Sequence, residues 1–166
     1  AIRARLDDRV KYAINGDKTE LGEKINYAAD LQKTNSVRFV SVLNCKSAET
    51  AFAAMRRTKE KFCKTGGVLG YHFIQSFAPG EVTPEQAHEV GMELAKEILG
   101  GKYEFVLTTH IDKDHVHNHL IFNAVSFADH RHYHSNKRSY HYIRRTSDRL
   151  CKEHGLSVII PGQDKG

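Results

Sequence analysis

Alternating polar and apolar residues predict a β-strand that begins at His115 and continues to Phe127. Polar residues stand at positions 115, 117, 119 and 123, and apolar residues mostly stand between them: Val116, Leu120, Phe122 and Val125. A period of two is typical of a strand with one apolar face. His115, His117 and His119 therefore project from the same side of the predicted strand, with neighbours ~6.5–7 Å apart at Cα.

A second strand is predicted just upstream, over residues 103–110, and residues 111–114 form the turn between the two strands. If the two strands pair as a hairpin, His110 faces the same side as the other histidines. A four-residue loop sets His110 opposite His115, with His117 as its diagonal neighbour. A six-residue loop sets it opposite His117, with His119 as the diagonal neighbour. The pattern leaves both registers open.

Two further strands are predicted from β-branched and aromatic residues. They cover residues 37–43 and 68–77, and in the second of them His72 and Ser76 share one face. Residues 158–160 add a short edge strand.

Four helices are predicted from helical spacing of apolar residues and from their end signals. The first runs from about Arg5 to Ile14, and the second is capped by Ser47. The third begins at Thr83, where Thr, Pro and Gln suit a capping box, and runs to Leu99. The last runs from about Arg138 to His154.

Helices grouped around strands that include a hairpin indicate an α+β fold, in which helices flank a central, mainly antiparallel β-sheet. The 166 residues suit a single domain over positions 1–166. The strand order does not follow from the pattern.

Composition narrows the cellular setting. The formal net charge is +5 with neutral histidines, so the surface attracts polyanions. The three cysteines, Cys45, Cys63 and Cys151, are widely spaced, which argues against a disulfide framework and a thiolate zinc site. With no long apolar run and no recognisable signal peptide, we expect a soluble cytoplasmic protein.

Four histidines and two aspartates within residues 110–119 predict a divalent metal site. Two imidazoles on one strand face can converge on an ion at ~2.1 Å, and three leave coordination positions open. An open all-histidine site favours catalysis over a purely structural role. Asp112 and Asp114 are candidate acceptors that fix the tautomer of a ligand. The alternative is a polar hairpin face in water, with one functional histidine.

On a basic protein, a natural ligand for the open position is a phosphate oxygen. A metal there would draw charge from the non-bridging oxygens of a phosphodiester. The nucleophile is then either metal-activated water or a side chain, and composition selects none of the seven tyrosines.

Four segments of the chain carry motifs in an order known from one family. Residues 9–19 resemble its first motif, whose nucleophilic tyrosine matches Tyr12, and residues 71–81 resemble its second, where Ser76 matches a DNA-contacting serine. The histidine hairpin resembles the third motif, and residues 147–157 resemble the segment after it. The chain therefore resembles the MobP-type relaxases or mobilisation nucleases, within the histidine-hydrophobe-histidine (HUH) endonuclease superfamily.

Aligned on Asn123, the resemblance implies three metal ligands: His110, His117 and His119. His115 is the substitute, because residues 115–117 fit the literal superfamily pattern. The residue between the preferred pair is Asn118, where the superfamily has a hydrophobe.

Relaxases transfer DNA strands for conjugative plasmids and integrative conjugative elements. The resemblance implies metal-assisted transesterification with Mn²⁺ or Mg²⁺, and Zn²⁺ as an alternative. Tyr12 attacks one strand at an origin of transfer, becomes a 5′-phosphotyrosine and leaves a free 3′-hydroxyl. A free phenol has a pKa of ~10, so Asp112, Asp114 or a histidine is expected to take its proton.

The implied partners are single-stranded or hairpin DNA at the origin of transfer and an accessory relaxosome protein, in a bacterial cytoplasm. By the same resemblance, we expect this domain to be the N-terminal part of a longer protein.

Seven residues are candidate DNA contacts: Ser76, His72, Asn123, Arg131, Tyr133, Lys137 and Arg138. Residues 130–138 interleave basic and aromatic side chains, which suits contact with single-stranded DNA; a solvated loop fits equally well. His72 either lines the site or is a satisfied core histidine. The basic residues of segment 56–64 are interpreted as a solvated helix face.

Two other classes fit the same residues. One is a metal-dependent phosphodiesterase that uses water, in which Tyr12 is structural. The other is a non-catalytic DNA-binding module whose metal only stabilises the hairpin.

Overall fold

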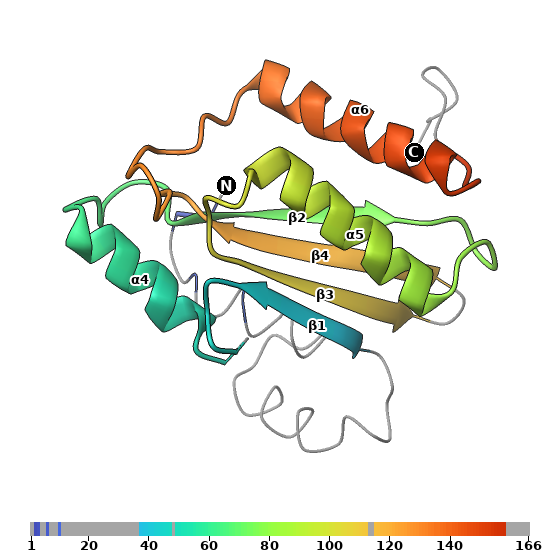
Figure 1. The fold of residues 1–166 in the computed structure, drawn as a ribbon, viewed down its shortest axis with the longest axis horizontal. Coiled ribbons are helices and arrows are strands. Elements are labelled where there is room, and N and C mark those ends of the chain that lie inside the picture. The colour runs from blue at the N-terminus through green and yellow to red at the C-terminus, as the bar shows by residue number, and fades with distance from the viewer. Residues whose placement is uncertain are drawn as a thin grey trace.

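Four antiparallel strands form one sheet in the order β1-β3-β4-β2, which confirms the predicted α+β fold (Figure 1). The computed structural model describes residues 2, 3, 6, 10, 37–47, 49–112 and 115–158. The four strands are β1 (Val37–Leu43), β2 (Gly70–Ser76), β3 (Phe105–Asp112) and β4 (His115–Asn123). The predicted hairpin, β3 with β4, forms the centre of the sheet.

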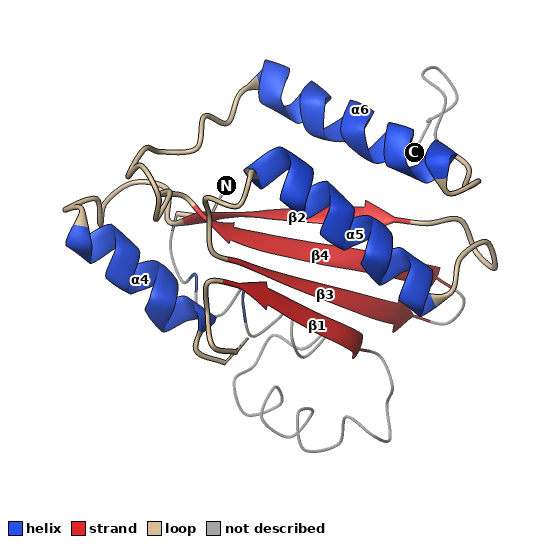
Figure 2. Ribbon diagram, viewed as in Figure 1, coloured by secondary structure: helices blue, strands red, loops and turns tan. Residues whose placement is uncertain are grey.

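Within residues 37–158, three helices accompany the sheet among the described positions: α4 (Ala51–Lys61), α5 (Pro84–Leu99) and α6 (Lys137–Glu153). Helix α5 crosses one face of the sheet and α6 lies beside it, on the side of β2 (Figure 2). None of the helices in the described part of the chain is long and apolar enough to cross a membrane.

Each face of the sheet has its own core, because neighbouring residues of a strand point to opposite sides. Under α5, Leu107 and Leu120 pack with Ala95. On the opposite face, Val106 and Ile121 pack with residues of α4 and of the N-terminal segment: Met55, Leu6 and Val10. The helices therefore cover both faces.

The N-terminal segment is attached to the second face. The backbone N–H of Ile2 donates to the carbonyl oxygen of Gly70 at 2.7 Å. Leu6 and Val10 are helical and buried, as the first predicted helix requires. Tyr12 lies outside the described residues.

Helix α5 has the ends that its sequence predicts. Thr83 Oγ1 accepts from the backbone N–H of Gln86 at 3.2 Å, and Gln86 Oε1 accepts from the backbone N–H of Thr83 at 3.3 Å. Gly100 ends the helix in the left-handed conformation, at a φ of 59°, which glycine adopts without a Cβ penalty.

The hairpin boundaries differ from the prediction. The turn was placed over residues 111–114, but Ile111 pairs with Val116 and Asp112 with His115, so β3 continues to Asp112. Ile111 also packs beside Val116 in the core under α5 and α6, and this contact stabilises the longer strand.

The predicted strand 115–127 is likewise too long, since β4 ends at Asn123. After it, the chain pairs with its own connection to α6, where the backbone N–H of Tyr133 donates to the carbonyl oxygen of Ala124 at 2.8 Å. Val158 is not in a strand, and the rest of the predicted edge strand lies outside the described residues.

Helix α4 begins later than predicted, at Ala51, with Thr50 instead of Ser47 at the N-cap. Ser47 and Thr50 exchange hydrogen bonds just ahead of the helix, so the cap prediction was wrong by three positions. The buried face of α4 includes Lys59, which is only 4% exposed, so the interpretation of every basic residue in this segment as solvated is also wrong. All three cysteines are free, as predicted.

Candidate metal centre

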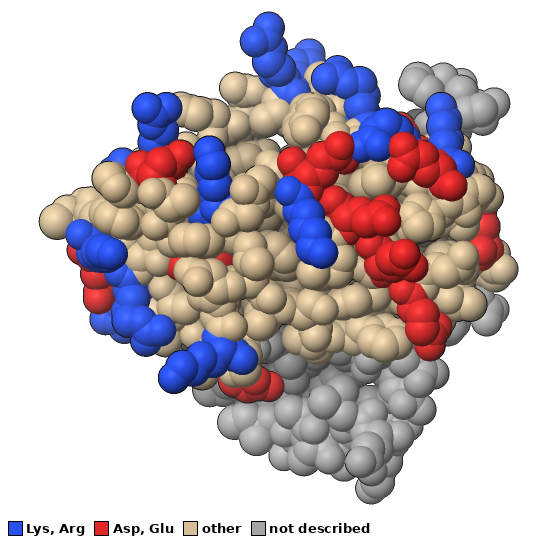
Figure 3. All heavy atoms as spheres, in the orientation of Figure 1, with Lys and Arg blue, Asp and Glu red and all other residues tan. Residues whose placement is uncertain are grey.

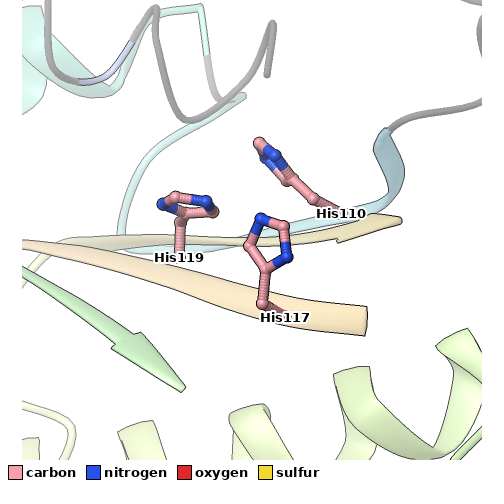
Figure 4. Close-up of side chains that lie close together, drawn as sticks. All are labelled: His110, His117 and His119. Carbon is pink, nitrogen blue, oxygen red and sulfur yellow. The ribbon is translucent and has the colours of Figure 1, made fainter. Parts of the chain in front are cut away.

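Three histidines of the β3–β4 hairpin converge above one face of the sheet (Figure 4). Their strand register is the second of the two predicted: His110 pairs with His117, and His119 is the diagonal neighbour. His115 lies two pairs closer to the turn, opposite Asp112, and is exposed. The structure therefore brings together the three preferred histidines and leaves the substitute outside the cluster.

The spacing of the three rings suits one metal ion. One ligand nitrogen from each residue lies within 4.8 Å of the others. The ring centroids are 4.3 Å apart for His110 and His119, 4.9 Å for His117 and His119, and 5.3 Å for His110 and His117. Bonds of ~2.1 Å hold two nitrogens at most ~4.2 Å apart, so small side-chain rotations complete the coordination. The donor set fits a divalent ion.

Burial keeps one of the three histidines, His119, in the protonation state that binds metal. His110 and His119 are 4% and 3% exposed, whereas His117 is half-buried and forms the accessible side of the site. Burial, followed by the positive charge that His110, His72 and His117 can carry, lowers the pKa of His119 to about 2. His119 is therefore a neutral imidazole at physiological pH, as a ligand must be.

Hydrogen bonds orient two of the three rings. His72 Nε2 lies 2.8 Å from His119 Nδ1, and Thr108 Oγ1 lies 3.0 Å from His110 Nε2. A histidine whose one ring nitrogen is held by a neighbour presents the other to the ion. His72, for which the sequence predicted either a place in the site or a core role, is half-buried on β2 and hydrogen-bonded to His119.

Other predicted site residues are only partly described. Asp112 ends β3, but its side chain lies outside the described part of the structure, as do Asp114 and Tyr12. Ser76 is exposed at the end of β2, where it pairs with His117. Its position beside the accessible ligand suits contact with a bound strand.

Asn123 does not fit the DNA contact that the sequence predicted. It is fully buried and its side-chain oxygen accepts from Lys59 Nζ at 2.7 Å, while its amide nitrogen donates to Glu104 Oε2 at 3.2 Å. Thr58 donates to the other carboxylate oxygen of Glu104. Asn123 thus joins α4 to the sheet inside the protein. Sequence analysis missed this cluster because nothing local shows that charged residues 45 positions apart are buried together.

The connection between β4 and α6 divides into exposed and packed residues. Arg131, Lys137 and Arg138 are exposed, as a DNA-contacting role requires. Tyr133 instead packs edge-on against Tyr71 and Phe122, with ring centroids 5.1 and 4.9 Å away, and burial raises its pKa. The ring is thus part of the core under α5, which leaves little of it for stacking on a base.

Comparison with known proteins agrees with the fold. A family model described as the MobA/VirD2-like relaxase nuclease domain matches residues 27–156, which include the histidine hairpin but not Tyr12. The chain is 38% identical over 147 residues to a Staphylococcus aureus protein called rlx, covering 89% of this chain and 44% of that protein.

A second relative is the group II intron-interrupted relaxase LtrB of Lactococcus lactis subsp. cremoris, 34% identical over 148 residues. That match covers 69% of this chain and 26% of the relative. The chain thus spans less than half the length of these curated relatives. No solved structure gives a significant match.

Proposed function

The chain belongs to the MobA/VirD2-like relaxase family, and on that premise we propose that it nicks one DNA strand at an origin of transfer, with Tyr12 as nucleophile. The observation that carries the proposal is the cluster of His110, His117 and His119 beside an accessible face. The family match supports DNA as substrate, and the cluster supports metal assistance.

The three histidines would hold the ion. A divalent ion bound there supplies positive charge to the non-bridging oxygens of the scissile phosphate. Three imidazoles suit Zn²⁺ better than Mg²⁺, which prefers oxygen ligands. Mn²⁺ stays a candidate because phosphate and water oxygens would fill the open positions.

The phenol of Tyr12 carries out the bond exchange in this mechanism. Its oxygen forms a bond to phosphorus while the bond from phosphorus to the 3′ oxygen breaks, and the product is a 5′-phosphotyrosine with a free 3′-hydroxyl. The phenolic proton passes to a base, for which Asp112 and Asp114 are the nearest carboxylates in the sequence to the ligands. The leaving 3′ oxygen gains a proton. Because a phosphoester is retained, the reaction reverses to rejoin the strand.

The packing of the N-terminal segment supports Tyr12 as nucleophile. Val10 is buried with Val106 and Ile121, on the face of the sheet that carries the histidines. On their strands, these two residues stand two positions from Thr108 and His119. A residue two positions after Val10 has its Cα within ~7.6 Å of that of Val10, since each trans peptide spans ~3.8 Å. The burial of Val10 on this face supports the proposal that Tyr12 acts there.

The basic exposed residues of the connection to α6 support a role in DNA binding. We include Ser76, Arg131, Lys137 and Arg138 in the proposed contact surface, and His72 as a residue that lines the site. A bacterial cytoplasmic setting and an accessory relaxosome protein complete the proposal.

A denaturing gel tests the function directly. The domain is incubated with end-labelled single-stranded fragments that tile the intergenic DNA of its own element, with Mn²⁺ or with a chelator. We expect a protein-sized shift of the label that requires metal and disappears in Tyr12→Phe. Tyr140→Phe, at an exposed tyrosine of α6, is the matched control and should retain the shift.

The other outcomes separate the competing functions. Free cleaved DNA that survives in Tyr12→Phe would show a nuclease that uses water. Binding to every fragment without cleavage would show a module in which the metal only stabilises the hairpin.

A further inference from the structure

A row of hydrogen-bonded polar side chains, buried at its centre and half-buried toward its ends, crosses the sheet on the face opposite the histidines. It connects all four strands with α5 and α6 through hydrogen bonds of 2.6–3.0 Å, and its members are Ser41, His88, Thr109, Asn118, Gln75 and Ser147. At its centre is Asn118, which is 1% exposed and stands between His117 and His119 on β4.

Every polar atom of the Asn118 amide has a partner. Its oxygen accepts from Thr109 Oγ1 at 2.6 Å, and its nitrogen donates to Gln75 Oε1 at 3.0 Å and to the carbonyl oxygen of Ala87 at 2.7 Å. These bonds tie β4 to β3, to β2 and to α5. Any displacement of an amide whose two hydrogens and oxygen are all hydrogen-bonded would break at least one of these bonds.

The bonds also run in one direction. The single hydroxyl hydrogen of Thr109 goes to Asn118, so Thr109 accepts from His88 Nδ1, at 2.8 Å. The other ring nitrogen of His88 then accepts from Ser41 at 2.6 Å. Burial lowers the pKa of His88, which favours this neutral ring. All the hydrogen bonds of this row, from Ser41 on β1 to Ser147 on α6, are therefore satisfied by one assignment of donors and acceptors.

Helix α5 is shaped to accept this amide. A Cβ at Gly91 would lie 2.6 Å from Asn118 Nδ2 and 3.1 Å from Leu107 Cδ2. Glycine in a helix interior is destabilising relative to alanine, so its presence needs a reason. The close approach of Asn118 is that reason here.

The position of Asn118 matters because strand register determines where the histidines lie. A shift of β4 by one residue would move His117 and His119 into the core and turn Asn118 to the other face. A hydrophobic residue at position 118 would pack in more than one arrangement, whereas the amide is satisfied only where Thr109, Gln75 and Ala87 surround it.

We propose that Asn118 is a positioning residue of the histidine site: its buried amide holds β4 in the register that sets His117 and His119 opposite His110 and beside His72. The metal-binding readout of this inference rests on the proposed function, but the register readout does not.

The test separates geometry from stability. Asn118→Leu alone leaves Thr109 and Gln75 without their partner, so it is compared with the triple variant Gln75→Met/Thr109→Val/Asn118→Leu, in which all three positions are apolar. We expect the triple variant to unfold cooperatively at a lower melting temperature, because His88 and the Ala87 carbonyl lose their partners. Below that temperature it should bind Co²⁺ at least ~10-fold more weakly than wild type, with an altered visible absorption spectrum. An unchanged Co²⁺ affinity and spectrum would overturn the proposal.

Gly91 provides a second test through a double-mutant cycle. Gly91→Ala should weaken Co²⁺ binding and lower the melting temperature in the wild type, because the methyl group displaces the Asn118 amide. In an Asn118→Ala background the same change should cost much less, because most of the clash is removed. Equal losses in both backgrounds would show that α5 and Asn118 act independently, against the proposal.

A wild-type protein that binds no Co²⁺ would refute the metal role without deciding the register. The register is then read from amide hydrogen exchange in β3 and β4 and from the imidazole NMR signals of the three histidines. Faster exchange and shifted signals in the triple variant would support the positioning role, and wild-type behaviour would overturn it.

Discussion

At the scale of single residues, two kinds of buried polar group occupy opposite ends of the same face of the sheet. At one end, the buried rings of His110 and His119 converge with the ring of His117, and burial keeps His119 neutral. At the other end, Lys59 and Glu104 are an ionisable pair bridged by Asn123. The first group is suited to bind a ligand and the second to join a helix to the sheet.

The difference between His119 and His115 gives the first prediction. His119→Ala should lower Mn²⁺ affinity by more than the ~10–100-fold typical of losing a hydrogen-bonding partner of a ligand, since it removes a ligand itself. His115→Ala should leave the affinity nearly unchanged, because the cluster does not include that residue. Isothermal titration calorimetry measures both, and an equal loss in the two variants would make His115 a ligand.

The buried lysine gives a prediction about pH. Burial, partly opposed by the negative charge of Glu104, lowers the pKa of Lys59 from 10.5 to about 8. Between those values the unfolded chain binds more protons than the folded one, so stability rises with pH. We expect wild type to gain stability relative to Lys59→Met as pH rises from about 8 toward 10.5, by at most ~1.4 kcal/mol per pH unit.

Urea denaturation across that pH range measures the difference. Lys61→Met, at an exposed lysine of the same helix, is the control and should show no such gain. A constant difference between wild type and Lys59→Met would mean that the lysine keeps its ordinary pKa in the folded protein.

At the scale of elements, the contact between β2 and the N-terminal segment links the sheet to the proposed nucleophile. A Cβ at Gly70 would lie 2.8 Å from the carbonyl oxygen of Phe122 and 3.0 Å from Leu6 Cδ1. One of these neighbours is backbone of the paired strand and the other belongs to the segment that precedes Tyr12. The absence of a side chain at Gly70 thus lets the N-terminal segment pack closely on the sheet.

Gly70→Ala should therefore displace the N-terminal segment, which precedes Tyr12, from the sheet that carries the histidine cluster. We expect it to destabilise the domain by ~1–3 kcal/mol, as overpacking does, and to lower covalent adduct formation more than Mn²⁺ affinity. Gly66→Ala is the control, because a Cβ there meets nothing within 4 Å. Equal losses of adduct and of metal affinity would show that the N-terminal contact is unrelated to the nucleophile.

The elements also show where sequence analysis reaches its limit. The hairpin and the ends of α5 were predictable, because strand alternation and a capping box are local signals. The register was not, since the turn lacks the glycine or asparagine that specifies a loop length. The environments of Asn118 and Lys59 were not predictable either, because their partners lie on elements distant in the sequence.

At the scale of the whole molecule, acidic side chains gather on the outer surface of α5. Four glutamates follow the outer surface of α5 at helical spacing: Glu85, Glu89, Glu93 and Glu97. Figure 3 shows acidic side chains in a diagonal stripe over this helix. Glu97 and Glu93 pair with Arg149 and His154 of α6. The charge that repels a polyanion from α5 therefore comes mainly from Glu85 and Glu89.

Charge reversal at Glu85 and Glu89 tests whether the acidic surface of α5 repels DNA. Glu85→Lys/Glu89→Lys should tighten non-specific binding to single-stranded DNA on the order of 10-fold at low salt, and the gain should fade as salt rises. The rate of adduct formation should not increase, because the added charge lies on the wrong face. Fluorescence anisotropy and the denaturing gel measure the two effects, and a faster nick would place α5 on the path of the DNA.

The hairpin arrangement of the candidate ligands has a consequence for how the domain folds. The first and last ligands, His110 and His119, are nine positions apart on two adjacent strands. Contacts this local close in microseconds, whereas docking of β1 and β2 requires much longer loops to close. An ion that binds this site can therefore meet its ligands on a partly folded chain. The supply of metal during synthesis, as well as the selectivity of the finished site, then decides which ion is loaded.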